Sequence, residues 1–213
     1  MSTPTIEQLR AKYGDQQVMA VADKVITENL RNGFTYPSDA TVKLETGVTA
    51  PLRRLIAGAL TPVCRAEAEL DPSFKQVIPY VLVKDKAGRI FTTHRLAGDP
   101  RLTGQYSIGT GGHIDYGESI YDALYRELKE EACIEYPNIF DCAFSGYIYD
   151  GSSSVNSVHV GLVFTCMVND PDKVKVGEPE KLAAEWLTRD QVDALLKDGK
   201  LESWSVYVAE NLP

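Results

Sequence analysis

Apolar residues in the first third of the chain recur at a helical spacing. Six of them stand on one face of an expected helix: Val18, Val21, Ala22, Val25, Ile26 and Leu30. This i, i+3, i+4, i+7 pattern is typical of an amphipathic helix, and the "RNG" run at 31–33 is a stop signal. A second helix is expected over residues 51–60, because Pro51 suits the first turn of a helix. The N-terminal region is therefore predicted to be helical.

From Lys75 the hydrophobic pattern is typical of β-strands. Strands are expected in "QVIPYVLVKD", "DKAGRIFTTHRL", "QYSIGTGG", "FDCAFSGYIYD", "SVHVGLVFTCMV" and "AAEWLT". These runs are rich in β-branched and aromatic residues, and turn-forming segments separate them. Closing helices are expected in "RDQVDALLKDG" and "ESWSVYVAENL". The pattern predicts an α/β domain of the α+β type over residues 73–213, preceded by a helical extension over residues 1–72.

Composition and charge narrow the classes of function. The chain has 213 residues, of which 44% are hydrophobic and 24% charged, and its formal net charge is −8. An acidic surface disfavours long nucleic acid and anionic membranes as partners. No apolar run approaches the roughly 18 residues that span a bilayer, and the first residues lack the apolar stretch of a secretory signal. A cytoplasmic protein is expected.

The cysteines are scattered along the chain as Cys64, Cys133, Cys142 and Cys166, and they form no C-x-x-C pair. This spacing indicates neither a zinc site nor a disulfide framework. We expect buried free thiols, which pack as small hydrophobic side chains.

A helical run at 119–132 combines an apolar stripe with a crowded acidic face. Ser119 suits the N-cap position, and Asp122 completes a capping-box-like pair with it. Glu127, Glu130 and Glu131 are related by i+3 and i+4, so their side chains converge on one face. The neighbouring apolar stripe is expected to consist of Tyr121, Leu124, Tyr125, Leu128 and Ala132.

This acidic face has two alternative interpretations. The simpler one is a solvated face of a surface helix. Three nearby carboxylates repel one another, however, and a hard divalent cation is a stabilising partner for them. Gly111 and Gly112 precede the helix and can bring the backbone close to a ligand, which a solvated face leaves unexplained.

The same residues resemble a known motif. Gly112, Glu118 and the run "RELKEEACI" at 126–134 match the Nudix box, G-x5-E-x7-R-E-U-x-E-E-x-G-U, in which U is aliphatic. Both spacers agree, as do all charged and both aliphatic positions. Cys133 stands where the family has a glycine that eases the helix end, and a non-glycine residue in left-handed geometry costs about 1–2 kcal/mol. The flanking phrases "SIGTGGHID" and "VHVGLVF" also resemble a group of Nudix proteins of similar length, in which the N-terminal helices belong to the design.

The resemblance implies a fold and an activity. The fold is the Nudix fold over residues 75–200, a mixed sheet sandwiched between helices. The activity is hydrolysis of the diphosphate linkage of a nucleoside diphosphate joined to another group, such as a nucleotide sugar, ADP-ribose, a dinucleotide or a nucleoside triphosphate. The resemblance further implies Mg²⁺ as the cofactor, with Mn²⁺ as a frequent substitute, and a homodimer as a common assembly.

Metal-binding and catalytic roles follow from the resemblance. The expected metal ligands are Glu127, Glu130 and Glu131, a carbonyl of Gly111 or Gly112, and Glu118 through water. Glu127 is a candidate general base, and Arg126 is expected to orient a box glutamate through an ion pair. Some relatives add a carboxylate from the loop before a Glu-Trp strand. In "GEPEKLAAEWL" we favour Glu180 for this role over Glu178 and Glu185, while a solvated loop acid is the alternative.

Substrate contacts are less defined by the sequence. Arg95 and Arg101 flank the loop before the box and are candidates to bind phosphate or base, with a solvated surface position as the alternative. His113 follows the glycine pair and either reaches the substrate or packs beneath the loop. His159 is expected to be a hydrogen-bonded core histidine. The weaker candidates are Lys75, Gln76 and Tyr106, the last as a base-stacking or core aromatic.

Other functions compete with hydrolysis. A Nudix fold that senses a nucleotide metabolite without turnover is the first alternative, although a pure binding module has no need of the full glutamate set. An isoprenoid diphosphate isomerase requires an active-site cysteine, and no cysteine lies in the glycine loop. RNA decapping is disfavoured by the acidic charge and the absence of a basic stripe.

Overall fold

The computed structural model describes residues 4–43, 49–97, 103–152 and 156–212. It divides into two compact units. Unit 1 comprises Met1–Pro79, His113–Ala123 and Gly146–Leu162, and unit 2 comprises Tyr80–Gly112, Leu124–Ser145 and Val163–Pro213. Three strands and one helix contribute residues to both units: β6 (Phe74–Lys84), β9 (Ile139–Tyr149), β10 (His159–Val168) and α5 (Ile120–Ala132).

Unit 1 holds most of the N-terminal elements. They are α1 (Ile6–Tyr13), β1 (Gln17–Ala22), α2 (Asp23–Thr27), β2 (Gly33–Thr35), a 3-10 turn (Pro37–Asp39), β3 (Thr41–Lys43), β4 (Thr49–Pro51), α3 (Leu52–Ala59), β5 (Thr61–Cys64) and α4 (Arg65–Ala68), with a further 3-10 turn (Asn156–Val158) before β10. Strand β1 pairs antiparallel with β5 and with the first part of β6. Strand β2 pairs antiparallel with the end of β9, and β3 pairs with β4.

The single helix expected over residues 18–30 is wrong in its first part. Val18 to Ala22 belong to strand β1, and only Asp23–Thr27 are helical. Val18, Ala20 and Val21 are fully buried, so β1 buries residues on both of its faces. Hydrogen bonding to β5 and β6 therefore overrides a local pattern that strands and helices share. The second expected helix is confirmed as α3, with Pro51 one position earlier, at the N-cap.

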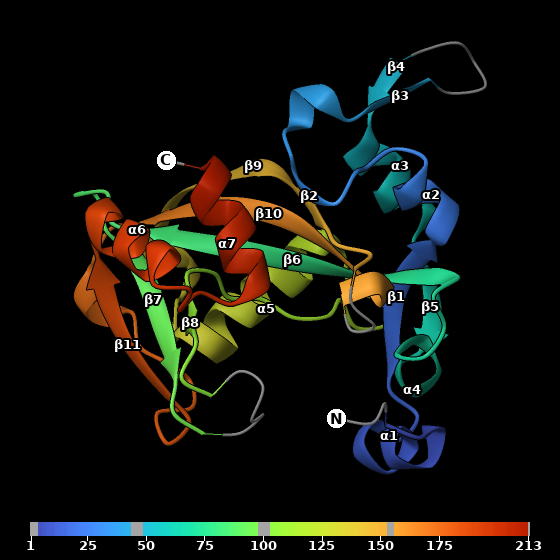
Figure 1. The fold of residues 1–213 in the computed structure, drawn as a ribbon, viewed down its shortest axis with the longest axis horizontal. Coiled ribbons are helices and arrows are strands. Elements are labelled where there is room, and N and C mark those ends of the chain that lie inside the picture. The colour runs from blue at the N-terminus through green and yellow to red at the C-terminus, as the bar shows by residue number, and fades with distance from the viewer. Residues whose placement is uncertain (1–3, 44–48, 98–102, 153–155, 213) are drawn as a thin grey trace. The chain divides into compact units, whose positions relative to one another are not determined.

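Unit 2 contains the remaining strands and the closing helices. They are β7 (Ile90–Arg95), β8 (Tyr106–Ser107), β11 (Leu182–Leu187), α6 (Arg189–Lys197) and α7 (Ser203–Asn211), with 3-10 turns at Tyr136–Asn138 and Pro171–Lys173. Strand β11 pairs antiparallel with β7 along its whole length, and β8 pairs with β7 (Figure 1). The hydrogen-bonded strand order is β11-β7-β6-β10-β9-β2. The strands and helices expected after residue 75 are confirmed.

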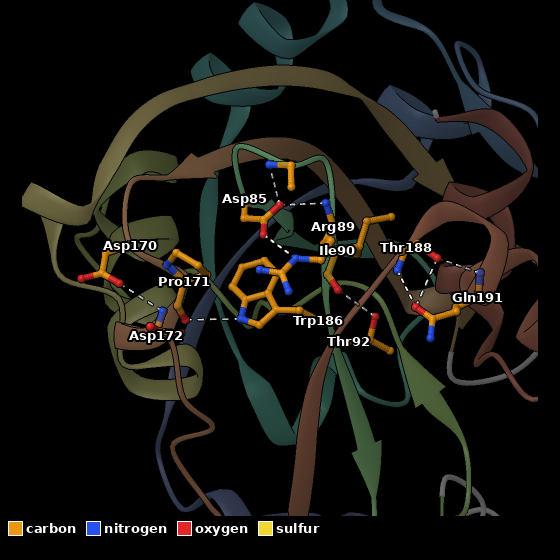
Figure 2. A network of polar contacts seen from close by, with 11 residues as sticks. Asp85, Arg89, Ile90, Thr92, Asp170, Pro171, Asp172, Trp186, Thr188 and Gln191 are labelled. Carbon is orange, nitrogen blue, oxygen red and sulfur yellow. Dashed lines mark hydrogen bonds and ion pairs between the residues drawn. The ribbon is translucent and has the colours of Figure 1, made fainter.

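Short polar contacts fix the turns of unit 2 (Figure 2). The carboxylate of Asp85, 2% exposed, accepts hydrogen bonds from the backbone of Arg89 at 2.8 Å and from its Nε at 2.7 Å. This pair closes the turn between β6 and β7. At the edge strand β11, Trp186 Nε1 donates to the Pro171 carbonyl at 3.3 Å. Thr188 then caps α6, because its hydroxyl and its backbone exchange hydrogen bonds with Gln191.

Helix α5 has the cap and the buried face that its sequence predicts. Ser119 Oγ accepts from the backbone N–H of Asp122 at 3.2 Å, and the Asp122 carboxylate accepts from the backbone N–H of Ser119 at 3.1 Å. The buried stripe includes Leu124, Leu128 and Ala132. Two members of the predicted stripe depart from it: 48% of Tyr121 is exposed, and Tyr125 is half-buried. Ala123, near the helix start, is fully buried instead.

The expectation of four buried free thiols is wrong. Cys142 on β9 and Cys166 on β10 form a disulfide, and these two strands are neighbours in the sheet. Cys64 and Cys133 are free, but Cys64 is half-buried and Cys133 is exposed. A sequence separation of 24 residues carries no pairing signal, because the register of two strands decides which residues stand opposite each other.

No helix within the described residues is long and apolar enough to cross a membrane.

Candidate functional site

Helix α5 presents its acidic face within unit 2 with an arginine among the carboxylates. Glu127 is buried, with 8% of its surface exposed, whereas 58% of the Glu130 side chain is exposed. Arg126 Nη1 donates to Glu127 Oε1 at 2.6 Å and to Glu130 Oε2 at 3.3 Å. The guanidinium therefore links two of the three glutamates and holds them at neighbouring positions on the helix.

The third glutamate is held by the glycine loop. Glu131 Oε2 accepts a short hydrogen bond from the Thr110 hydroxyl and a second one from the Gly111 backbone N–H at 3.2 Å. Thr110 is itself paired with Val81 of β6 through two backbone hydrogen bonds, at 2.7 and 3.0 Å. Strand β6 thus fixes the loop, and the loop in turn fixes the Glu131 carboxylate.

Gly112 lies directly against the Glu127 carboxylate. A Cβ atom built on Gly112 would be 2.3 Å from Glu127 Oε1 and 2.5 Å from its carboxyl carbon. Any larger residue would displace this carboxylate, so the close approach explains why glycine stands at the first position of the box. The loop backbone is therefore packed directly against the buried Glu127 carboxylate.

Burial raises the pKa of the Glu127 carboxyl above its usual range. The hydrogen bond and the positive charge of Arg126 oppose this rise, while the negative charges of Glu131 and Glu130 add to it. The ionised form of Glu127 is therefore destabilised by burial and by like charge. A cation among the three carboxylates would relieve both effects.

Cys133 ends α5 in left-handed backbone geometry. Its φ is 51°, and among the described residues it is the one non-glycine residue with a positive φ. The family glycine at this position would adopt the same geometry without a Cβ penalty. Glycine loses more backbone entropy on folding, about 0.4–1 kcal/mol, which offsets part of the gain.

Cys133→Gly is expected to raise the free energy of unfolding by about 0.5–1 kcal/mol, because it removes the left-handed strain of about 1–2 kcal/mol. Urea denaturation would measure the change. Cys133→Ala is the matched control, since it removes the thiol but keeps the Cβ. An equal gain in both variants would show that the thiol, and not the backbone geometry, is responsible.

A buried polar cluster anchors the start of the glycine loop. Tyr80 Oη donates to Glu202 Oε1 at 3.0 Å, and Ser205 Oγ donates to the same oxygen at 2.5 Å. Burial, followed by the charge of Glu202, raises the pKa of Tyr80 well above its usual range, so its hydroxyl stays a donor. Ser107 Oγ donates to the Gly109 carbonyl at 2.7 Å, and a Cβ on Gly109 would be 2.2 Å from the Tyr80 ring.

Glu202→Ala is expected to lower the free energy of unfolding by about 3 kcal/mol. The variant loses the N-cap of α7, where Glu202 accepts from the backbone N–H groups of Ser205 and Trp204, and it removes the buried oxygen to which the Tyr80 and Ser205 hydroxyls donate. Tyr80→Phe removes one donor only and should cost about 1 kcal/mol. Denaturant unfolding of both variants is the measurement, and a smaller loss for Glu202→Ala than for Tyr80→Phe would contradict the assigned role of Glu202.

The other expected metal and catalytic residues lie in different places. Glu118 belongs to unit 1, where its Oε2 accepts from the backbone N–H of Asp115 at 3.0 Å. Glu180 is exposed in the turn before β11, in unit 2. Its neighbour Glu178 forms an ion pair with Lys181 at 2.6 Å. Glu185 is exposed on β11. These placements leave the roles of Glu118 and Glu180 as predictions.

The expected substrate contacts are only partly described. Arg95 is half-buried at the end of β7, where its backbone N–H donates to Gln105 at 3.0 Å. Arg101 lies outside the described residues. His113 belongs to unit 1, and its Nε2 lies 3.2 Å from Nε2 of His159, which is 8% exposed. His159 is thus buried and hydrogen-bonded, in agreement with its expected place in the core.

The weaker candidates have structural partners or buried positions. Lys75 is 2% exposed and forms an ion pair with Asp23 at 2.7 Å. Gln76 is fully buried, and within the described residues its carboxamide atoms have no hydrogen-bond partner. Tyr106 stacks on His94 with ring centroids 4.3 Å apart, so one face of its ring is covered within unit 2.

Sequence reasoning missed two residues of interest. Thr110, which holds Glu131, stands inside the "GTGG" run, but a hydroxyl between glycines has no signal of its own. Glu69 lies close to the two histidines His113 and His159. Their separation in the sequence hides this proximity, and only the folded chain brings the three together.

Comparisons with known proteins agree with this geometry. The model of the NUDIX domain matches residues 75–209. The protein YmaB of Bacillus subtilis (strain 168) is 33% identical to this chain in an alignment of 214 residues. The alignment covers 94% of this chain and 98% of YmaB. The crystal structure of Tm1382 shares the fold, with a TM-score of 0.72, 24% identity, and coverage of 92% of this chain and 97% of that chain. DR0079 from Deinococcus radiodurans has a TM-score of 0.52 and 14% identity over 80% of this chain and 96% of its own. The chain belongs to the Nudix family, and the α+β Nudix fold expected from its sequence is confirmed.

Proposed function

We propose that this chain is a metal-dependent hydrolase that cleaves the diphosphate linkage of a small nucleotide derivative. The observation that carries the proposal is the acidic face of α5. Three glutamates of one helix are held by Arg126, Thr110 and the glycine loop, and one of them is buried with a raised pKa. A purely solvated surface face has no need for such fixation.

The donor set fits a hard divalent cation. Mg²⁺ prefers oxygen ligands and takes one or two carboxylates together with water and phosphate oxygens. Glu127, Glu130 and Glu131 offer carboxylates, and we propose a backbone carbonyl of Gly111 or Gly112 as a further ligand. Gly112 itself packs against the Glu127 carboxylate. A bound Mg²⁺ or Mn²⁺ supplies charge neutralisation for phosphate oxygens and a lower pKa for its water.

The remaining chemistry belongs to the side chains of the chain itself. Arg126 orients Glu127 through their 2.6 Å ion pair. Glu127 is a candidate to accept the proton of the attacking water, because its carboxylate is buried and its position is fixed by Arg126 and by the backbone at Gly112. Glu180 is the second candidate for this role, on the loop before β11. Arg95 and Arg101 are proposed to contact the phosphates or the base of the substrate.

A substrate panel tests the proposal. Release of phosphate or nucleoside monophosphate would be measured for nucleoside triphosphates, nucleotide sugars, ADP-ribose and dinucleotides, each with Mg²⁺, with Mn²⁺ and with chelator. Turnover of at least one compound that chelator abolishes is the expected result. Saturable nucleotide binding by calorimetry without turnover of any compound would contradict the proposal and favour a sensor.

A further inference from the structure

A second group of metal-ligating side chains meets in unit 1. Glu69, His113 and His159 each offer one ligand atom, and these atoms all lie within 4.8 Å of one another. The two imidazole Nε2 atoms are 3.2 Å apart, and the rings meet edge to face with centroids 5.3 Å apart. The glutamates Glu127, Glu130 and Glu131 belong to unit 2, so this group shares no residue with the acidic face of α5.

The spacing of these atoms suits a four-coordinate ion. Zn²⁺ binds imidazole nitrogen at about 2.0–2.1 Å, and in a tetrahedron this places two ligand atoms roughly 3.3 Å apart. The 3.2 Å between the Nε2 atoms of His113 and His159 matches that separation. The ligand oxygen of Glu69 lies up to 4.8 Å from the histidine nitrogens, so it needs to move about 1.5 Å closer to reach the tetrahedral separation. Rotation about the bonds of this unbranched side chain allows that movement.

Each ligand stands on a separately fixed segment. The backbone after His113 is held by Met19, whose N–H donates to the Ile114 carbonyl at 2.8 Å. His159 is the first residue of β10 and is buried. Glu69 ends α4, and its N–H donates to the Arg65 carbonyl at 3.1 Å. Three positions far apart in the sequence are thus brought together by the fold, as a preorganised metal site requires.

A simple histidine pair explains only part of this arrangement. A hydrogen bond between two imidazoles accounts for the 3.2 Å contact, but it does not account for a half-buried carboxylate at the third corner. Glu69 pairs with Arg65, whose Nε lies 3.8 Å from the Glu69 Oε1 in a long ion pair. An incoming cation would compete with this pair and gain a charged ligand.

We propose that Glu69, His113 and His159 bind a divalent transition-metal ion, with Zn²⁺ as the preferred ion. Two imidazoles and one carboxylate are ligands that suit zinc better than magnesium, and three protein ligands leave a fourth position for water or a ligand oxygen. This assigns His113 to metal binding in place of direct substrate contact. The proposal does not depend on the hydrolase activity, because the two sets of ligands have no member in common.

Cobalt substitution gives a direct test. Tag-free protein would be stripped with chelator, supplied with excess Mg²⁺ to fill oxygen sites, and titrated with Co²⁺ while its visible absorption is recorded. The expected result is intense absorption from a four-coordinate ion at one equivalent, which Zn²⁺ displaces. The intact chain should also gain thermal stability with Zn²⁺, because ligand binding to the native state stabilises it.

Variants assign the signal to the three residues. His113→Ala and Glu69→Gln are expected to weaken Zn²⁺ binding by at least about 100-fold and about 10-fold, respectively. His94→Ala is the matched control, because His94 is the third histidine of the chain and stacks on Tyr106 in unit 2. Glu130→Gln should leave the Co²⁺ spectrum unchanged. The proposal is overturned if wild type gives no such spectrum, if the spectrum survives both His113→Ala and Glu69→Gln, or if Glu130→Gln abolishes it. Circular dichroism checks the fold of each variant, and should His113→Ala unfold, Glu69→Gln decides.

Discussion

Glu130→Gln is expected to reduce metal-dependent turnover by about 100-fold or more and to leave the free energy of unfolding within about 0.5 kcal/mol of wild type. The loss in activity follows from removing a charged metal ligand, since loss of even an outer partner of such ligands costs about 10–100-fold. The fold should survive because 58% of the Glu130 side chain is exposed, and its carboxylate pairs with Arg126 at 3.3 Å. Such a pair contributes little to stability.

Glu135→Gln is the matched control for this prediction. It makes the same change of charge just beyond the end of α5, at a side chain that is 68% exposed and pairs with Lys129 at 3.5 Å. Its turnover should equal that of wild type. Glu131→Gln should also lose activity, although it keeps an oxygen that can accept from Thr110. Wild-type activity in both Glu130→Gln and Glu131→Gln would exclude the acidic face of α5 as the metal site.

The fold after residue 75 could be predicted because its signals are local. Alternating and β-branched runs mark β6, β9 and β10, and the pair Ser119 and Asp122 marks the start of α5. The helix predicted at residues 18–22 is wrong for a physical reason. Their side chains are buried on both faces of a strand, and such a strand has no period of 2 to distinguish it from a helix.

One part of the candidate site could likewise be predicted from local sequence, and another part could not. Glu127, Glu130, Glu131 and Gly112 lie within one short motif, so their spacing on a helix and loop could be inferred from sequence. The hydrogen bond from Thr110 to Glu131 and the cluster of Glu69 with His113 and His159 depend on which segments the fold brings together. The disulfide between β9 and β10 likewise depends on strand register, which spacing alone does not contain.

Gly177→Ala is expected to lower the free energy of unfolding by about 2–3 kcal/mol and to reduce activity as well. A Cβ at this position would lie 1.8 Å from the backbone carbonyl oxygen of Glu130. No side-chain rotation can relieve a clash between two backbone segments, and overpacking of this kind typically costs about 1–3 kcal/mol. Moving the loop away would also break the bond from the Gly177 N–H to the Glu131 carbonyl at 2.8 Å.

The effect on activity follows because Gly177 packs against the backbone of the helical turn that carries Glu130 and Glu131. Displacing that turn shifts both carboxylates, so turnover should fall even at temperatures where the variant is fully folded. Gly58→Ala is the matched control: nothing lies within 4 Å of its added Cβ, and in helix α3 it should stabilise the chain by about 0.5–1 kcal/mol. Urea denaturation and steady-state kinetics on all three proteins measure both effects. If Gly177→Ala matched wild type in stability and turnover, the close packing of the loop at Gly177 against the end of α5 would be wrong, and with it the inference that this contact holds the acidic face in place.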